Sequence, residues 1–256
     1  MDIADFNRKA WDQQVENGNV WTLPVSAEQV AAAREGRWDV LLTPTKTVPR
    51  AWFGEVRGKD ILLLASGGGQ QGPILAAAGA RVTVYDNSPR QLERDRQVAA
   101  RDGLEITTLL GDMRDLSVLA SESFDLIFHP VSNCFVDTVL PVWQGAFRVL
   151  RHGGTLLAGF NNPILYAFDQ ELLSKQGVFQ VANRLPYADV ESMKEEDRTR
   201  LFGAGSPLEW SHTLSEQIGG QLEAGFLLAG FYEDIDPNDP ISDYMTSYIA
   251  TRAIKI

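Results

Sequence analysis

Six residues rich in glycine, Gly67-Gly68-Gly69-Gln70-Gln71-Gly72, match the pattern G-x-G-x-x-G, and Asp86 lies 86 − 67 = 19 residues beyond the first glycine. The glycines follow the apolar run 61–65 and precede the small apolar residues 74–80, as a turn between a strand and a helix would. Glycines let a ligand approach the backbone, a helix start presents free N–H groups, and a carboxylate can accept hydrogen bonds from both hydroxyls of a ribose. This pattern predicts a nucleoside cofactor site. A tight turn with a surface aspartate is the structural alternative.

Two further groups of side chains follow apolar runs that we interpret as strands. Gly111-Asp112-Met113 offers a carboxylate that could accept from the exocyclic amine of an adenine, and an apolar side chain that could cover its face. His129 opens the segment His129-Pro130-Val131-Ser132-Asn133-Cys134. A neutral imidazole there could take a proton from an acceptor near neutral pH. A histidine bonded to a backbone carbonyl is the alternative, and Cys134 is expected to be a packing residue.

Alternating strands and helices must position these groups. Apolar runs predict strands at 61–65, 81–86, 106–110, 124–128, 155–160, 226–233 and 245–254. Helices are predicted between them at 74–80, 89–101, 139–150 and 213–224, the second with Ser88 as N-cap and Pro89 at its first position. Repeated alternation predicts an α/β fold with a doubly wound, mostly parallel sheet whose carboxyl edge carries the ligand site.

Four segments can be distinguished along the chain. Residues 1–55 are predicted to form a mostly helical N-terminal extension with four tryptophans, and residues 56–162 a Rossmann-like cofactor-binding core. Residues 163–210 interrupt the alternation, and we interpret them as an inserted lid or acceptor segment, because a long insertion in a compact domain is often functional. Residues 211–256 return to the core with the last helix and a closing hairpin of strands.

Charge and composition narrow the function. The 23 Lys plus Arg and 34 Asp plus Glu give a net charge of −11, so no nucleic acid partner is expected. A single cysteine makes neither an internal disulfide nor a thiolate zinc site, and no metal is expected. No apolar run reaches the ~20 residues that span a bilayer, and the first residues lack the features of a secretory signal. We therefore expect a cytoplasmic monomer or homodimer without a membrane partner.

The combination of motifs resembles the class I S-adenosylmethionine-dependent methyltransferases, over roughly residues 60–160 and again from 213 onward. Leu64-Ala65-Ser66-Gly67-Gly68-Gly69 resembles the family's first motif, Asp86 its ribose-binding acid, and Gly111-Asp112-Met113 its adenine segment. The stretch 148–156 resembles its late "LKPGG" turn, and the ending Leu222-Glu223-Ala224-Gly225-Phe226 its last helix and hairpin. In this chain Leu63 and Ala65 stand where the family commonly has an acid and a glycine.

The resemblance implies a seven-stranded sheet with an antiparallel last strand, S-adenosylmethionine as cofactor and S-adenosylhomocysteine as product. The implied reaction is methyl transfer to a small-molecule acceptor by in-line displacement, with His129 as the candidate catalytic residue. The candidate cofactor-binding residues are Ala65, Ser66, Gly67, Gly69, Gln70, Gln71, Asp86, Asn87, Gly111, Asp112, Met113 and His129. Lys46 or Arg50 could reach the cofactor's carboxylate, and the candidates for the acceptor pocket are Asn161, Asn162, Tyr166, Trp210 and His212.

Two other functions remain open from the sequence. An NAD(P)-dependent oxidoreductase would use the same glycine turn and Asp86, although the chain has no Tyr-x-x-x-Lys pair, which one common class of these enzymes requires. A non-catalytic cofactor-binding homologue would account for Leu63 and Ala65. Titration with S-adenosylmethionine and NAD distinguishes a methyltransferase from an oxidoreductase. Transfer of a labelled methyl group distinguishes an enzyme from a non-catalytic homologue.

Overall fold

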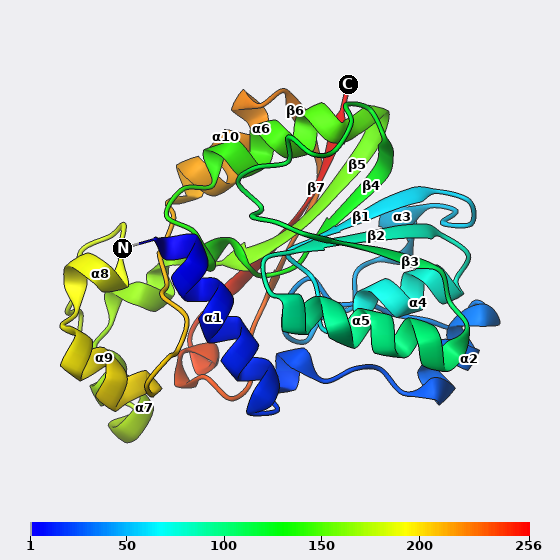
Figure 1. Ribbon diagram of the computed structural model, residues 1–256. Helices are drawn as coiled ribbons and strands as arrows, with labels where there is room; N and C mark the ends of the chain where they lie inside the picture. The colour runs from blue at the N-terminus through cyan, green and yellow to red at the C-terminus, as the bar shows by residue number, and fades with distance from the viewer. Residues whose placement is uncertain (1) are drawn as a thin grey trace.

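The computed structural model describes residues 2–256 and contains one seven-stranded sheet (Figure 1). The strands are β1 (Asp60–Leu64), β2 (Arg81–Asp86), β3 (Ile106–Leu110), β4 (Phe124–His129), β5 (Leu150–Asn161), β6 (Phe226–Asp234) and β7 (Tyr248–Lys255). Their order across the sheet is β3-β2-β1-β4-β5-β7-β6. Strands β1 to β5 pair in parallel, while β7 runs antiparallel to both β5 and β6. The predicted fold class, with its antiparallel last strand, is confirmed.

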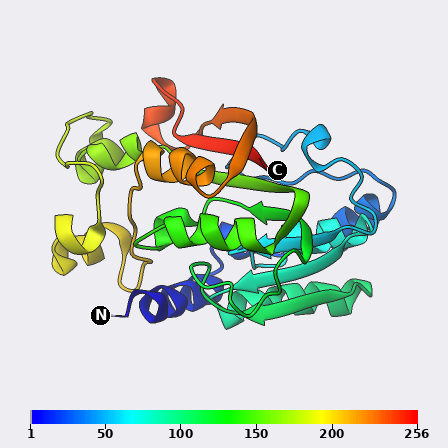
Figure 2. The same cartoon turned by 90° about the horizontal axis from the view of Figure 1, so that it is seen from above.

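Helices cover both faces of the sheet, as the buried apolar residues 61–64 of β1 require. Ile61 and Leu63 of β1 pack with one group of helices, and Leu62 and Leu64 face the other way. The first group comprises α2 (Ala27–Arg34), α3 (Arg50–Phe53), α4 (Gln71–Ala77) and α5 (Pro89–Asp102). On the opposite face lie α6 (Leu140–Val149) and α10 (Gly220–Glu223), which are in contact (Figures 1 and 2).

Local signals in the sequence account for the boundaries of helix α5. Ser88 Oγ accepts a hydrogen bond from Gln91 N at 3.1 Å, and Pro89 occupies the first helical position, where its missing N–H costs nothing. The helix ends at Gly103, whose positive φ of 62° suits glycine. Helix α5 thereby starts directly behind the end of β2, which fixes the position of Asp86 relative to the glycine turn.

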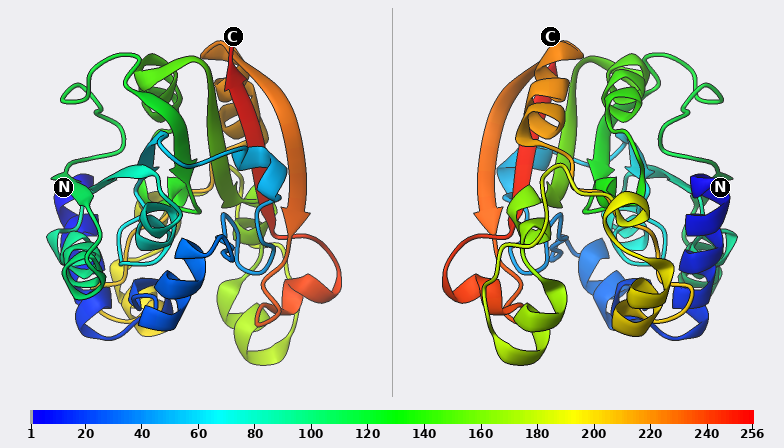
Figure 3. Two further views of the ribbon diagram at one scale, coloured as in Figure 1. Left: turned by 90° about the vertical axis from the view of Figure 1, so that its right-hand side faces the viewer. Right: turned by 90° about the vertical axis from the view of Figure 1, so that its left-hand side faces the viewer.

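Two segments outside the alternating core lie toward the same end of the sheet, opposite to the C-terminus (Figure 3). Helix α1 (Ile3–Glu16) and helix α2 come before β1, and α7 (Gln170–Gln176), α8 (Asp189–Ser192) and α9 (Glu195–Phe202) lie between β5 and β6. Asn7 joins the two segments, because its amide donates to Leu208 O at 3.0 Å and accepts from Leu208 N at 2.7 Å. The amide also donates to Phe135 O at 2.8 Å, so α1 is fixed across the carboxyl edge of the sheet.

The stretch before α10 departs from the predicted regular helix. Residues Ser215–Gly219 form a π-helical turn, and only Gly220–Glu223 continue as an α-helix. Within the π-helical turn, Gln217 is buried and its Oε1 accepts a hydrogen bond from Asn133 Nδ2 at 2.7 Å. Among the helices of the described residues, none has the length and apolar character needed to cross a membrane.

Candidate functional site

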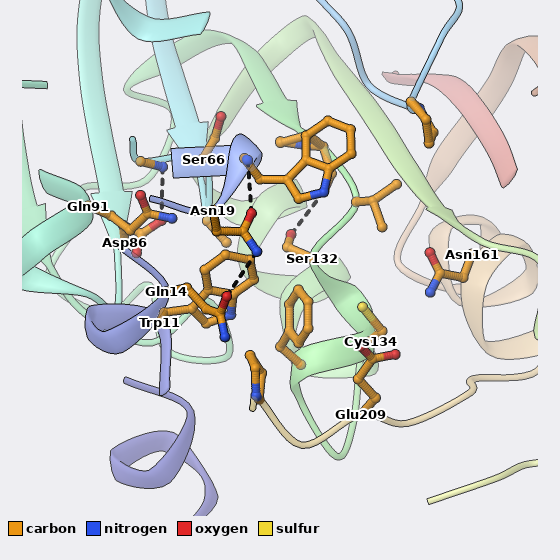
Figure 4. Close-up of a pocket in the computed structure, with 18 of the residues that line it drawn as sticks. Trp11, Gln14, Asn19, Ser66, Asp86, Gln91, Ser132, Cys134, Asn161 and Glu209 are labelled. Carbon is orange, nitrogen blue, oxygen red and sulfur yellow. Dashed lines mark hydrogen bonds between the residues drawn. The ribbon is translucent and has the colours of Figure 1, made fainter. Parts of the chain in front are cut away.

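A cavity of about 880 Å³ opens at the carboxyl edge of the parallel strands (Figure 4). One side of it is lined by the ends of β1, β2 and β3, and the other side by residues of the segment between β5 and β6. The N-terminal segment contributes Trp11, Gln14, Asn19 and Trp21. Strand ends of a doubly wound sheet, a turn rich in glycine and two covering segments therefore meet around one chamber.

The glycine turn and Asp86 are held together at this cavity. Gly67 N donates to Asp86 Oδ2 at 2.9 Å, and Ser88 N donates to Asp86 Oδ1 at 2.9 Å. Burial raises the pKa of Asp86, and these backbone bonds oppose that rise. A Cβ at position 67 would lie 2.7 Å from Gln91 Cβ and 3.1 Å from Asp86 Oδ2, so the close approach requires glycine. The carboxylate and the open backbone of the turn form a cradle that suits a ribose.

Ala65 begins the turn in a left-handed conformation, with φ of 47°, and lines the cavity. Its N–H donates to Tyr85 O at 2.8 Å, which ties the turn to β2. Left-handed backbone is unfavourable for a residue with a Cβ and is found mostly where function or packing imposes it. An alanine in place of the family's usual glycine therefore keeps the turn's conformation.

A buried carboxyl group that the sequence analysis did not single out lies beneath the turn. Asp95, on α5, is fully buried, and its Oδ2 accepts a hydrogen bond from Gly68 N at 3.0 Å. Its Oδ1 has no hydrogen-bond partner among the described residues and lies 3.1 Å from where a Cβ of Gly72 would be. Burial and, to a smaller extent, the nearby Asp86 raise the pKa of Asp95 to about 8. Asp95 is consequently protonated at neutral pH.

Asp95→Asn should make the free energy of unfolding less dependent on pH between about 4 and 8. The pKa of Asp95 is near 4 in the unfolded chain and about 8 in the folded protein, so its contribution is complete below pH 4 and is lost as the pH rises through 8. Asparagine keeps an acceptor for Gly68 N and carries no charge. Urea unfolding at several pH values tests this expectation, which an unchanged pH dependence in the variant would contradict.

The end of β3 also faces the cavity. Asp112 and Met113 both line it, and Met113 is buried. The Asp112 carboxylate accepts from Arg114 Nε at 3.0 Å and from its terminal nitrogen at 2.5 Å, while Arg114 also pairs with Asp137 at 2.5 Å. Gly111 does not line the cavity, and a Cβ there would lie only 1.9 Å from the Tyr85 hydroxyl. Gly111 is thus required by packing behind the site.

Three amide side chains at the turn bind protein groups. Gln70 Nε2 donates to Val20 O and Leu23 O, both at 3.1 Å, and so attaches the N-terminal segment to the turn. Gln71 Oε1 accepts from Ser66 Oγ at 3.4 Å, and Asn87 Nδ2 donates to Ala4 O at 2.8 Å. Both glutamines, Ser66 and Asn87 line the cavity. Gly69 does not line it and packs behind it against Arg94.

His129 lies behind the cavity wall. Its side chain is fully buried, with Nδ1 at 2.8 Å from Leu64 O and Nε2 at 2.7 Å from Asn133 Oδ1. Burial lowers the pKa of His129. Because both ring nitrogens are engaged and the residue does not line the cavity, His129 joins the ends of β1 and β4 and is not placed to contact an acceptor.

The wall opposite the glycine turn contains a chain of hydrogen bonds. Tyr166 Oη donates to Glu209 Oε2 at 2.6 Å and accepts from Asn161 Nδ2 at 2.8 Å. Glu209 N donates to Asp189 Oδ2 at 3.0 Å, and the Tyr187 hydroxyl donates to the same carboxyl group at 2.7 Å. All five residues line the cavity. Burial, together with Asp189, raises the pKa of Glu209 to about 7.

Asn161 and Tyr166 were candidates for this wall, whereas Glu209, Asp189 and Tyr187 were missed. An isolated Glu or Asp in an irregular segment gives no periodic signal, and these three meet only through the fold. The other candidates lie elsewhere: Trp210 and His212 are buried outside the lining, and Asn162 Nδ2 donates to Thr246 O at 3.3 Å.

The basic residues of the N-terminal segment do not face the cavity. Lys46 Nζ donates to Glu233 O, and Arg50 donates to Trp38 O at 2.7 Å with its guanidinium 3.3 Å from the Trp38 ring centre. Trp11 and Trp21 line the cavity, and Trp38 is part of the core around β1. The N-terminal contribution to the chamber thus includes aromatic, amide and aliphatic side chains and the acid Asp39, but no basic side chain among the described residues. Among residues 2–256, no group of His, Cys, Asp and Glu is arranged to hold a metal ion.

Comparison with known proteins identifies the family. The model of a family described as "Methyltransferase domain" matches residues 62–158, which include β2 to β4 and most of β1 and β5. The chain is 50% identical to "Uncharacterized methyltransferase YbaJ" of Bacillus subtilis over 254 residues, which cover 99% of each chain. It is also 25% identical over 191 residues to a sterol 24-C-methyltransferase of Neurospora crassa, covering 73% of this chain and 45% of that protein.

Solved structures support the same fold. An S-adenosylmethionine-dependent methyltransferase from Mesorhizobium loti superimposes with a TM-score of 0.61 at 20% identity. The alignment covers 80% of this chain and 94% of that one. At this identity the likeness concerns the fold, and the near full-length relative carries the family assignment.

Proposed function

The chain belongs to the class I S-adenosylmethionine-dependent methyltransferases, and we propose that it methylates a small molecule held in the cavity opposite the glycine turn. The observation that supports this proposal most strongly is that one cavity of about 880 Å³ contains both sets of residues. The strand ends and the glycine turn line one side, and the hydrogen-bonded wall around Glu209 lines the other. A nicotinamide-dependent oxidoreductase is not supported by these relatives.

The residues at the turn fit the cofactor, and we propose a role for each group. Asp86 would hold the ribose of the cofactor, and Asp112 and Met113 would hold its adenine. The rest of the cofactor would contact the other lining residues of this side: Ala65, Ser66, Gly67, Gln70, Gln71 and Asn87. Gly69 and Gly111 would shape the backbone from behind. The cofactor supplies a methyl group on a sulfonium, which is reactive without a strong nucleophile in the protein.

The chain's own residues would orient the acceptor and exclude water. We propose that the segment 163–210 and the N-terminal residues cover the chamber, because both line it and Asn7 joins them. His129 would act as a positioning residue, since its ring nitrogens hold Leu64 and Asn133 in place.

The proposal also covers the class of substrate, the cellular location and the oligomeric state. The net charge of −11 argues against a nucleic acid as substrate, and a chamber covered on two sides favours a small molecule. We propose that the protein acts in the cytoplasm as a monomer or homodimer.

Calorimetric titration with S-adenosylmethionine, S-adenosylhomocysteine and NAD tests the cofactor assignment. We expect micromolar affinity for the first two and none for NAD, since the glycine turn belongs to a methyltransferase. The protein should first be checked for cofactor retained through purification, which would mask binding. Binding of NAD alone would contradict the proposal, and transfer of a labelled methyl group into a metabolite panel would show catalysis directly.

A further inference from the structure

We propose that the methyl acceptor is an amine and that Glu209 accepts its proton. The inference rests on the proposed function and names the substrate class of the same cavity. Its basis is the wall formed by Asn161, Tyr166, Tyr187, Asp189 and Glu209, defined here as the acceptor wall. Figure 4 shows Asn161 and Glu209 beside the cavity, across from Asp86.

Glu209 is the carboxyl group of the acceptor wall with an oxygen left for a ligand, and the buried amide oxygen Asn161 Oδ1 also has no hydrogen-bond partner among the described residues. Its Oε2 accepts from the Tyr166 hydroxyl at 2.6 Å, while Oε1 accepts no hydrogen bond from residues 2–256. The Asp189 carboxyl group, in contrast, accepts from Tyr187 Oη and from Glu209 N. Tyr166 is fixed in turn by Asn161 Nδ2, so the first oxygen of Glu209 is immobilised and the second is presented to the cavity.

The charges around the cavity favour a cationic ligand. Arg114 is the one cationic side chain among the described residues that line it, and two carboxylates, Asp112 and Asp137, already bind its guanidinium. The lining carboxylic acids are Asp39, Asp86, Asp112, Asp189, Glu209 and Asp239. A carboxylate or phosphate on the acceptor would meet acids without a free cation to bind it.

An ammonium suits Glu209 better than an alcohol does. A buried carboxylate without a counter-charge is unfavourable. In the protein without a ligand, the pKa of Glu209 is therefore raised to about 7. A bound ammonium would stabilise the ionised form, whereas a neutral hydroxyl would leave it uncompensated. The other titratable groups near Glu209 are Tyr166, Cys134, Asp189, Tyr187 and Tyr248, and none of them is a cation. Asp189 raises the pKa of Glu209, whereas the hydrogen bond from Tyr166 lowers it. Arg198, near Asp189, is paired with Glu195.

The proton balance of the step is simple. The bound ammonium loses one N–H proton to Glu209 Oε1, which exposes the nitrogen lone pair. The lone pair forms the new N–C bond to the methyl group, and the electron pair of the broken C–S bond remains on the sulfur. The carboxyl group of Glu209 then releases its proton to solvent, so one proton is liberated for each methyl group transferred.

Three ligands of similar shape test the substrate class without requiring turnover. Phenethylamine, 2-phenylethanol and 3-phenylpropionate are titrated at pH 8 into protein saturated with S-adenosylhomocysteine. We expect the amine to bind at least about tenfold more tightly than the alcohol, as a hydrogen bond between charged groups provides. At pH 7, amine binding should release protons as Glu209 ionises, which calorimetry in two buffers of different ionisation enthalpy measures.

Glu209→Gln should abolish both the amine preference and the proton release. Glu191→Gln is the matched control, because Glu191 is an exposed glutamate of α8 in the same segment and should leave both unchanged. The inference is overturned if the amine fails to bind more tightly than the alcohol or the carboxylate, or if Glu209→Gln keeps the preference. A parallel titration with S-adenosylmethionine should give equal affinity in wild type and Glu209→Gln. Its failure in wild type would overturn the proposed function instead.

Discussion

Asp86→Ala is expected to weaken the binding of S-adenosylmethionine by about 1.5 to 3 kcal/mol, or roughly 10- to 150-fold, as for the loss of hydrogen bonds to a charged group. The carboxylate lies at the end of β2, and its Oδ2 also accepts from Gly67 N at 2.9 Å. The substitution therefore removes the proposed ribose contact and one bond that holds the glycine turn. Calorimetric titration of the purified variant measures the change.

Asp86→Asn provides the matched control for this substitution. Asparagine keeps one oxygen acceptor for Gly67 N but carries no charge, so its affinity should lie between those of wild type and Asp86→Ala. Circular dichroism and a thermal melt establish that both variants are folded. An Asp86→Ala variant that is folded and binds with unchanged affinity would show that the cofactor lies elsewhere.

Trp143→Ala should lower the free energy of unfolding by about 3 to 5 kcal/mol, the usual cost of removing a large aromatic side chain from a core. Trp143, on α6, is fully buried, and its ring lies 6.0 Å from that of His129 in an edge-on arrangement. Its indole nitrogen donates to Glu216 O at 2.9 Å, in the π-helical turn. The variant would therefore lose core packing and leave a buried carbonyl without its donor. Urea unfolding measures the change.

Trp143→Phe distinguishes the two contributions, because phenylalanine keeps much of the apolar volume but lacks the indole N–H. We expect it to be less destabilising than alanine. Neither substitution touches the cavity lining, so the affinity for S-adenosylmethionine should persist at low temperature. A loss below about 1 kcal/mol in Trp143→Ala would be inconsistent with a closely packed core at this position.

The core of the fold was predictable because its elements carry local signals. Continuous apolar runs identified β1 and β4, and Ser88-Pro89 identified the start of α5. Seven strands were expected and seven are observed, although β5 begins at Leu150, five residues before the predicted start, and α4 begins at Gln71, three residues early. Helix 213–224 was predicted as regular but contains a π-helical turn. Within that turn Gln217 pairs with Asn133, which lies 84 positions away, and no local pattern encodes such a contact.

The two sides of the cavity differed in how far the sequence could describe them. Asp86 and Asp112 follow strands that end at one edge of the sheet, so topology alone places them together. Glu209 comes from an irregular segment with short helices, and its meeting with Tyr166 depends on how that segment folds back. For His129 the sequence predicted a position near the site correctly, because the residue ends a strand. The sequence does not predict which way the side chain points.

The contact of Asn7 with Leu208 also bears on the order in which the protein is made. The two residues are 201 positions apart, and the hydrogen bonds between them fix the N-terminal helix against the segment that carries Glu209. Contacts between such distant positions form slowly, because the intervening chain must first be ordered. A chain still on the ribosome that has passed residue 112 but has not reached residue 209 contains β2, β3, Asp86 and Asp112 but lacks Glu209. The chamber is therefore closed on the acceptor side only late in synthesis, after the parallel strands exist.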